Sequence, residues 1–427
     1  MVTLLRNNLA KLLKKRLNQN LLWMLYAQFG SRLLRVICTI IVARILAPEV
    51  YGLVALVLSI NEMVHVLSHG GISGKLIQAK ESELPILCNT GYWLNWILCI
   101  FLMILQFILA WPISWFYDNG NLILPIIVLS ITYLFLPLGT LQAALIIREN
   151  RLSVIAHVEI LQSVIDALLT LMLVIAGFGL WALVLPKLLV APIWVWQMLK
   201  NHSWRPTKNP NFNQWRSIIN FGINLIWIDL LTALRNNIDY LIIGRLLGIE
   251  ALGIYYFAFN AGLGLSQGLL RAACNAIYPH LCELEGQLQA IALRMLTSMR
   301  GIVLTFSPLI LLQALLAPFY VPIIFGEKWQ NFGAIPLISI LCISAIPRLF
   351  SECCSQFLRA CNKPSTDAKA QTLFTGVYTL SIYCTAHFSL IHVAWGVFAS
   401  QIAFSCIFVY WSFHLICPDL KLFAQKV

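Results

Sequence analysis

Long apolar stretches recur along the whole chain, and each is about as long as the hydrocarbon core of a lipid bilayer is thick. A helix needs about 20 mostly apolar residues to cross that core. The backbone inside lipid must satisfy its own hydrogen bonds, which favours helices. A β-barrel would instead show segments of about ten residues with alternating polarity. The chain is therefore predicted to be an all-α integral membrane protein.

The composition excludes an ordinary soluble domain. Of the 427 residues, 60% are hydrophobic and 11% are charged, whereas soluble domains carry about a quarter charged residues. A soluble protein of this size would lack the polar side chains to cover its surface. The 12 cysteines are scattered without the spacing of a metal site or a disulfide framework. They are expected to be small apolar core residues.

Twelve stretches have the length and polarity of a membrane span. Their limits are 21–46, 51–70, 89–110, 121–147, 154–176, 179–199, 217–247, 251–270, 298–321, 333–358, 368–388 and 391–416. A basic linker at 200–216 divides the spans into two six-helix halves, 21–199 and 217–416, which are predicted to surround a central polar cavity. Residues 1–20 are expected to form an amphipathic helix on the inner leaflet, and residues 417–427 a cytoplasmic tail.

Charge predicts the orientation of the chain in the membrane. With both termini in the cytoplasm, 21 lysine and arginine residues fall on the inner side and Lys328 alone falls on the outer side. Cytoplasmic segments of membrane proteins carry such an excess. The formal net charge of +12 is explained in this way and needs no nucleic-acid partner. The inner-side residues are Arg6, Lys11, Lys14, Lys15, Arg16, Lys75, Lys80, Arg148, Arg151, Lys200, Arg205, Lys208, Arg216, Arg271, Arg294, Arg300, Arg359, Lys363, Lys369, Lys421 and Lys426.

A short internal repeat joins the two halves. The segment 43–52 reads ARILAPEVYG, and the segment 244–253 reads GRLLGIEALG. Arginine, leucine, glutamate and glycine recur in register, 201 residues apart. Because each half has six spans, both copies have the same topology, which implies parallel repeats about an axis along the membrane normal and a site between them.

The same residues carry a resemblance to a known family. The segments 44–56 and 67–78, followed in the second half by Phe325-Gly326-Glu327-Lys328-Trp329 and Cys361-Asn362-Lys363-Pro364, resemble bacterial polysaccharide-biosynthesis flippases. These are the Wzx-type exporters of the multidrug/oligosaccharidyl-lipid/polysaccharide exporter superfamily. The resemblance implies transport of an undecaprenyl-pyrophosphate-linked oligosaccharide from the inner to the outer leaflet of the bacterial cytoplasmic membrane. In two respects the chain departs from many relatives: His69 stands where an acid is often found, and twelve spans replace fourteen.

Arg32 and Arg35 are the first candidates for substrate binding. They lie three residues apart in span 21–46, and no acid lies three or four residues from either. Guanidinium groups match a pyrophosphate in planar, bidentate geometry. We therefore predict that both line the cavity and hold the lipid pyrophosphate. The alternative is an interhelical ion pair with Asp229, Glu159 or Asp166.

Three further cations lie within spans, where charge is costly. Arg235 is followed four residues later by Asp239, and Arg348 by Glu352, so each pair can neutralise itself on one helix face. Each pair can equally face the cavity. Lys187 follows Pro186 in span 179–199 and is a third candidate for binding substrate.

Six titratable residues within the spans are candidates for binding a coupling H⁺ or Na⁺. For each of them, the alternative is an interhelical hydrogen bond. His65 would titrate most readily near neutral pH. They are Glu62, His65, Glu159, Asp166, Asp229 and Asp239.

The resulting prediction is a flippase that works by alternating access and catalyses no covalent reaction. No cofactor is expected, and the sequence contains no nucleotide-binding loop of the form Gly-x-x-x-x-Gly-Lys-Ser/Thr. The expected partners are lipid-linked oligosaccharide, membrane lipids, and a polysaccharide polymerase with other assembly proteins. Two alternatives stay open: a multidrug or small-solute antiporter of the same superfamily, and a membrane enzyme of polysaccharide assembly.

Overall fold

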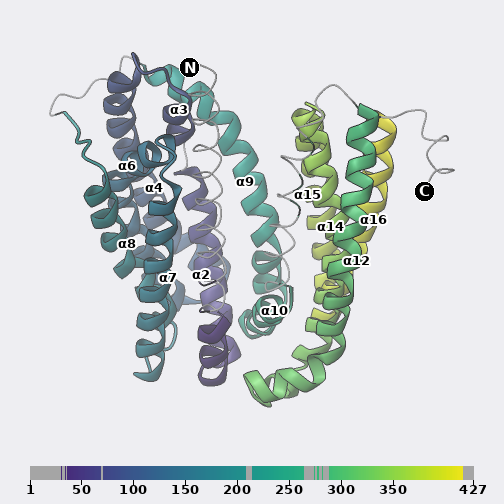
Figure 1. Ribbon diagram of the computed structural model, residues 1–427. Helices are drawn as coiled ribbons and strands as arrows, with labels where there is room; N and C mark the ends of the chain where they lie inside the picture. Colours follow the sequence, from purple (N-terminus) through teal and green to yellow (C-terminus); the bar gives the residue numbers. More distant parts are fainter. Residues whose placement is uncertain are drawn as a thin grey trace. The chain divides into compact units, whose positions relative to one another are not determined.

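Helices make up the regular structure of the described residues (Figure 1). The computed structural model describes residues 30, 34, 36–68, 71–207, 214–263, 274, 277, 281 and 288–416. The longer helices are α2 (Pro48–Leu67), α4 (Leu84–Phe116), α7 (Leu152–Ile175), α8 (Trp181–Asn201), α9 (Trp215–Leu246), α12 (Leu288–Tyr320), α14 (Ala334–Ala360), α15 (Pro364–Ala386) and α16 (Leu390–Ile416). The shorter elements are α3 (Ile72–Gln78), η1 (Gly120–Leu122), α5 (Ile123–Ser130), η2 (Ile131–Leu134), α6 (Leu136–Arg148), α10 (Ile249–Ala261), the π-helical turn η3 (Val321–Phe325) and α13 (Lys328–Asn331).

The helices follow the predicted spans. In the described part, seven helices are long and apolar enough to cross a membrane, or eight if one bent pair is a single span. The longest helices, such as α4 with 33 residues, exceed the roughly 20 residues that a bilayer core requires. The predicted all-α membrane fold is confirmed, whereas the count of twelve spans stays a prediction.

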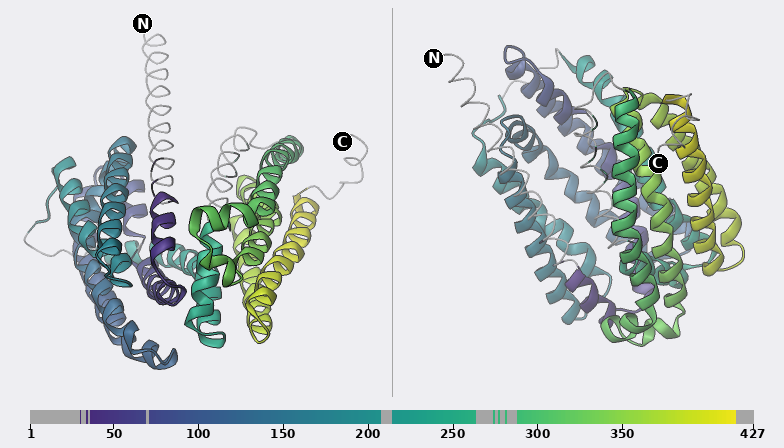
Figure 2. Two further views of the ribbon diagram at one scale, coloured as in Figure 1. Left: turned by 90° about the horizontal axis from the view of Figure 1, so that it is seen from below. Right: turned by 45° about the vertical axis from the view of Figure 1, so that its right-hand side comes forward.

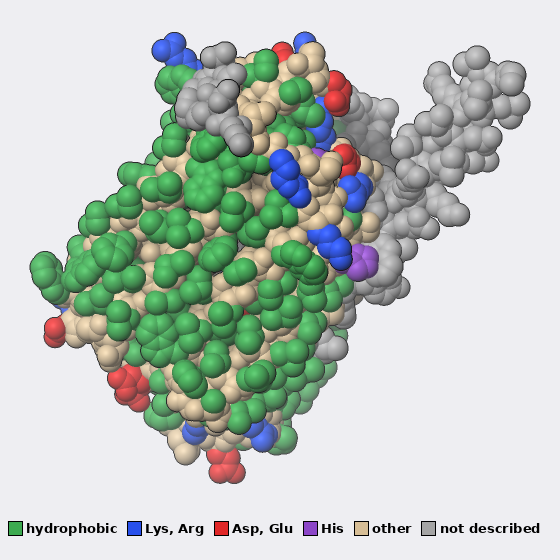
Figure 3. Space-filling view, turned by 90° about the vertical axis from the view of Figure 1, so that its left-hand side faces the viewer, with side chains coloured by type: hydrophobic (Ala, Val, Ile, Leu, Met, Phe, Trp, Pro, Cys, Tyr) green, Lys and Arg blue, Asp and Glu red, His purple; other side chains and the backbone are tan. Residues whose placement is uncertain are grey.

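The outward-facing side chains fit a lipid environment. Leu168, Met172 and Ile175 of α7 are 54%, 66% and 75% exposed. Figure 3 shows hydrophobic side chains over most of one face, with lysine and arginine side chains mainly in its upper part and a few at its lower end. Soluble monomers rarely expose apolar surface of this extent. This chain is therefore a multi-pass membrane protein.

The helices pack into two units. Unit 1 contains residues 1–46 and 56–233, and unit 2 contains residues 47–55 and 234–427. Both α2 and α9 change unit along their length, α2 between Ala55 and Leu56 and α9 between Ala233 and Leu234. The predicted division at the linker 200–216, and a cavity between halves, stay predictions.

One pair of consecutive helical stretches in unit 1 is bent. The helical stretches Gly120–Leu134 and Leu136–Arg148 meet at 51°. Pro137 stands at the start of the second stretch, where its ring cannot continue the preceding hydrogen-bond ladder. Gly139 lets Trp194 of α8 lie against the backbone of α6, because a Cβ there would lie 2.7 Å from the Trp194 ring.

A buried polar network joins α2, α4 and η2 in unit 1. The Tyr133 hydroxyl donates to Gln106 Oε1 at 3.1 Å, and Gln106 Nε2 donates to Asn61 Oδ1 at 3.3 Å and to the Ile126 carbonyl at 3.0 Å. Tyr133 and Gln106 are fully buried. Inside lipid the hydrophobic effect does not drive helices together, and hydrogen bonds between polar side chains help to hold them in contact.

The two copies of the sequence repeat contact each other within unit 2. A Cβ on Gly52 of α2 would lie 1.9 Å from the Ile249 carbonyl oxygen of α10. Conversely, a Cβ on Gly253 would lie 1.7 Å from the Pro48 carbonyl oxygen. Pro48 and Ile249 are themselves 201 residues apart, as are the two glycines. The contact is thus reciprocal, and only glycine permits such close helix backbones.

An aromatic cluster packs beside this crossing. Trp329 is fully buried, stacks on Phe257 with ring centroids 3.8 Å apart, and meets Tyr51 edge-on at 5.4 Å. Gly326 takes a φ of 103°, which turns the chain from η3 into α13. The segment 325–329 thereby places the Trp329 side chain between α2 and α10.

The rest of unit 2 is a helix bundle. Helices α12, α15 and α16 all pack against α14, and Figure 2 shows this green-to-yellow bundle from two further directions. Pro347 lies inside α14, and its carbonyl accepts the Ser405 hydroxyl of α16 at 2.6 Å. The bundle brings polar side chains of four helices to one place, described next.

Candidate functional site

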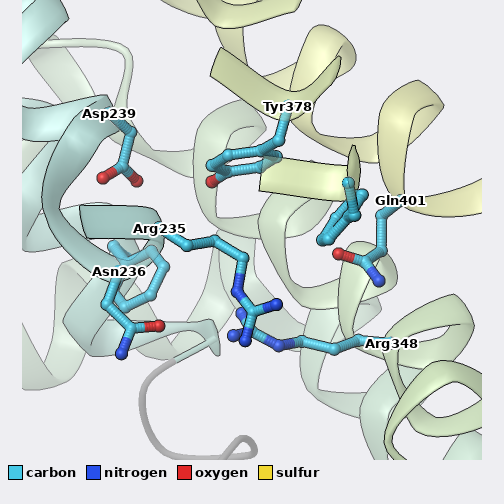
Figure 4. A pocket seen from close by; sticks show the side chains of 8 residues that line it. Arg235, Asn236, Asp239, Arg348, Tyr378 and Gln401 are labelled. Carbon is cyan, nitrogen blue, oxygen red and sulfur yellow. The ribbon is translucent and has the colours of Figure 1, made fainter. Parts of the chain in front are cut away.

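A small pocket in unit 2 is lined by side chains of five helices, and four of these helices contribute polar groups (Figure 4). Its water-accessible volume is about 20 Å³, which is room for roughly one water molecule. It is lined by Arg235, Asn236 and Asp239 of α9, Phe259 of α10, Arg348 of α14, Phe374 and Tyr378 of α15, and Gln401 of α16.

Two guanidinium groups dominate the pocket. Figure 4 shows the Arg235 and Arg348 side chains, which come from different helices, ending in the same part of it. Arg235 also lies over the Phe374 ring, 5.8 Å from its centroid. The Arg348 side chain is 19% exposed. Two planar donors of this kind suit a phosphate.

Asp239 turns its carboxylate to other partners. The side chain is 1% exposed, and its oxygens accept from the Tyr255 hydroxyl and from the Tyr240 backbone N–H, both at 3.0 Å. A buried carboxylate requires such donors. The same-helix pairing predicted from the spacing of Arg235 and Asp239 is therefore not what holds this carboxylate.

The second predicted local pair is present but long. Arg348 Nε lies 4.0 Å from Glu352 Oε1, one helical turn away, and the two side chains are 19% and 29% exposed. Pairs of this length and exposure contribute little to stability. Arg348 thus lines the pocket and also pairs loosely with Glu352 on the same helix.

Lys187 pairs with Asp166 in unit 1. Its ammonium group lies 2.9 and 2.8 Å from the two carboxylate oxygens, joining α8 to α7. The side chains are 46% and 29% exposed. Asp166 was an alternative partner for Arg32 and Arg35 in the sequence, and the structure gives it Lys187. These two charges belong to unit 1 and are not part of the unit 2 pocket.

The pairing leads to a test. Lys187→Met is expected to lower the melting temperature of the purified protein more than the double change Lys187→Met with Asp166→Asn. Removing one partner leaves a charge in a helix interface, whereas removing both does not. After a discount for partial exposure, we expect a difference of about 1 kcal/mol. Equal melting temperatures would show that the pair has no structural role.

The remaining predicted coupling residues also lie in unit 1. His65 stacks on the Tyr133 ring with centroids 6.3 Å apart, and Glu62 is exposed. Glu159 of α7 and Asp229 of α9 are half-buried. The structure therefore does not bring these four side chains to the pocket that holds Asp239.

Two of the predicted substrate-binding residues, Arg32 and Arg35, lie outside the described residues, as does His69. Their roles stay predictions. Of the other candidates, Arg235 and Arg348 meet in one pocket, and Lys187 lies elsewhere.

Sequence reasoning missed the polar face of α15. Gln371, Phe374 and Tyr378 lie on one side of this helix; the last two line the pocket, and Gln371 accepts a hydrogen bond from Arg235. The spacing of Asp367, Gln371 and Tyr378 by about one and two turns was a signal that this span has an inward polar face.

The chain matches a family model described as "Polysaccharide biosynthesis protein" over residues 41–334. Two similar curated proteins are the teichuronic acid biosynthesis protein TuaB of Bacillus subtilis (strain 168) and the lipopolysaccharide biosynthesis protein WzxC of Escherichia coli (strain K12). The first is 23% identical over 329 residues, covering 76% of this chain and 67% of TuaB. The second is 25% identical over 315 residues, covering 72% of this chain and 62% of WzxC. The match thus spans about two thirds of these relatives.

Solved structures share the fold at low identity. A lipid II flippase MurJ in an inward closed conformation superposes with a TM-score of 0.77 at 10% identity, covering 91% of this chain and 87% of MurJ. An inward-facing multidrug resistance MATE family transporter of the MOP superfamily superposes with a TM-score of 0.71 at 15% identity. The superposition covers 91% of this chain and 96% of the transporter. At such identities the likeness concerns the fold alone.

Proposed function

Because this chain belongs to the polysaccharide biosynthesis protein family, we propose that it flips an undecaprenyl-pyrophosphate-linked oligosaccharide from the inner to the outer leaflet of the bacterial cytoplasmic membrane. The oligosaccharide would serve a surface polysaccharide such as O-antigen, capsule or exopolysaccharide. The observation that carries the proposal is the meeting of Arg235 and Arg348 in one pocket of a membrane-embedded unit. Two guanidinium groups that meet in one place offer the planar donors that a phosphate group prefers.

The proposed mechanism is alternating access without a covalent step. The two guanidinium groups hold the pyrophosphate, and the polyprenyl tail stays in lipid. Side chains such as Asn236 and Gln401 lie beside them and can hydrogen-bond sugar hydroxyl groups. The substrate moves only if its affinity differs between the inward and outward states of the protein.

Coupling to H⁺ or Na⁺ is part of the proposal. A carboxylate that exchanges a cation must change its surroundings during the cycle. Asp166 has Lys187 as its partner, and Asp239 has Tyr255 and Tyr240. Either carboxylate would have to leave or alter these contacts when a coupling cation binds.

We also propose the orientation that the basic residues favour, with both termini in the cytoplasm. Arg148, Arg151 and Lys200 lie at helix ends on the proposed inner side, and Lys328 lies in α13 on the proposed outer side. Burial lowers the pKa of Lys328. The positive-inside rule supports this assignment.

Deleting the gene in the organism that carries it tests the function against both rivals. A flippase deletion would abolish the surface polysaccharide and accumulate lipid-linked oligosaccharide that is protected from an enzyme added outside spheroplasts. Loss of a ligase or polymerase would accumulate the same lipid in an accessible form. Loss of a multidrug antiporter would change drug sensitivity and leave the polysaccharide intact. Either of the last two results would contradict the proposal.

A further inference from the structure

A chain of hydrogen bonds leads from the pocket to a buried carboxylate in unit 2. Arg235 Nη1 donates to Gln371 Oε1. Gln371 Nε2 donates to Ser355 Oγ at 2.9 Å, and Ser355 Oγ donates to Asp367 Oδ1 at 2.7 Å. The chain connects α9, α15 and α14, and none of its members beyond Arg235 lines the pocket.

The direction of this chain is fixed by its two ends. A guanidinium group can only donate, and an ionised carboxylate can only accept. The single hydroxyl proton of Ser355 therefore goes to Asp367, and the Ser355 oxygen accepts from the amide nitrogen of Gln371. The amide oxygen of Gln371 is then the atom left to face Arg235. Through Ser355, Asp367 in this way sets the orientation of the Gln371 amide.

Charge explains why an amide stands at this position. Asp367 is buried and is also held by Arg359, whose Nε lies 2.8 Å from Asp367 Oδ2. The negative charge of Asp367 is thus balanced by Arg359, which does not line the pocket. A carboxylate at position 371 would form an ion pair with Arg235 and cancel the charge that an anion needs. The amide accepts the same hydrogen bond without that loss.

We propose that Gln371 is a positioning residue that holds the Arg235 guanidinium group towards the pocket without placing a negative charge beside it, which favours a phosphate-bearing ligand. The inference rests on the proposed function only in taking the pocket as an anion site. It assigns a specificity role to a residue that does not itself line the pocket. It also accounts for the Ser355 and Asp367 side chains, which orient Gln371.

Binding of inorganic pyrophosphate to the full-length protein in detergent tests this inference. The affinity is measured from the rise in melting temperature with ligand concentration. Gln371→Glu is expected to weaken pyrophosphate binding about tenfold or more, because a carboxylate beside Arg235 repels the anion. Without ligand this variant gains an ion pair with Arg235 but loses the hydrogen bond that Gln371 donates to Ser355, so the affinity for pyrophosphate, and not the melting temperature of the free protein, is the deciding readout. A purely structural role would lower the melting temperature and leave the affinity unchanged.

Two further variants make the test specific. Gln330→Glu makes the same change in net charge at an exposed position of α13 and should bind pyrophosphate like the wild type. Gln371→Met removes the hydrogen bond without adding charge and should weaken binding less than Gln371→Glu. It also serves as the test if Gln371→Glu fails to fold, because unchanged affinity in Gln371→Met would then overturn the inference.

Two results would contradict the inference. One is a Gln371→Glu protein that binds pyrophosphate as tightly as the wild type. The other is a wild type that pyrophosphate does not stabilise, since the pocket would then be no anion site. Flipping assays on the same proteins are read separately. A wild type that binds pyrophosphate but moves no lipid-linked oligosaccharide would remove the proposed function and leave the role of Gln371 intact.

Discussion

Gly52→Ala and Gly253→Ala are each expected to destabilise the protein by about 3 kcal/mol, near the upper end of the usual cost of overpacking. A single methyl group at either position would lie less than 2 Å from a backbone oxygen of the facing helix. A backbone oxygen cannot rotate away as a side chain can. The helices α2 and α10 would have to separate, which would also disturb the packing of Trp329 against Tyr51 and Phe257.

The reciprocity of the contact predicts a coupling between the two changes. Once one methyl group has moved the helices apart, the second finds room, so the double variant should lose less than the sum of the single losses. Gly301→Ala and Gly376→Ala are matched controls, because no atom lies within 4 Å of a Cβ at either helical position. These controls should be neutral or slightly stabilising. Melting temperatures that are equal in all four single variants would contradict the close crossing.

Removing both guanidinium groups of the pocket is expected to weaken binding of the lipid-linked oligosaccharide by about a hundredfold to ten-thousandfold. Hydrogen bonds to charged groups contribute about 1.5–3 kcal/mol each, and 1.4 kcal/mol corresponds to a tenfold change in affinity. Arg235→Ala or Arg348→Ala alone should therefore weaken binding about tenfold to a hundredfold. The measurement is the dissociation constant of the purified substrate for each variant.

Two comparisons separate charge from geometry. Arg235→Lys with Arg348→Lys keeps both charges and loses the planar donors, so its affinity should lie between the wild type and the double alanine variant. Arg300→Ala removes an exposed arginine of α12 and should bind like the wild type. If the double alanine variant binds substrate normally but does not transport it, the two residues act in a conformational step and not in binding.

The positions of the helices were predictable because a helix that crosses the bilayer must be apolar over about 20 residues, and such a stretch is visible in the local sequence. Predicted spans 154–176 and 391–416 agree with α7 and α16 to within two residues at each end. The structure also explains why glycine recurs in the repeat at 43–52 and 244–253, since each copy places it at a close helix crossing; the sequence did not predict that contact.

The partners of the charged side chains were not predictable in the same way. Spacing along one helix suggested Arg235 with Asp239, whereas Arg235 bonds to Gln371, 136 residues away, and Asp239 accepts from Tyr255 on the next helix. Lys187 and Asp166 are likewise joined across two helices. Such contacts depend on how helices rotate against one another, and a single sequence carries little information about that rotation.

The most direct test of the central claim is flipping by the purified protein in proteoliposomes. Undecaprenyl-pyrophosphate-linked oligosaccharide would be supplied in one leaflet, and its appearance in the other would be followed with an enzyme that cannot cross the membrane. The proposal predicts protein-dependent flipping by the wild type and by Arg300→Ala, and loss of flipping when Arg235 and Arg348 are both alanine. Equal flipping by the wild type and the double variant would contradict the assignment of the anion site to this pocket.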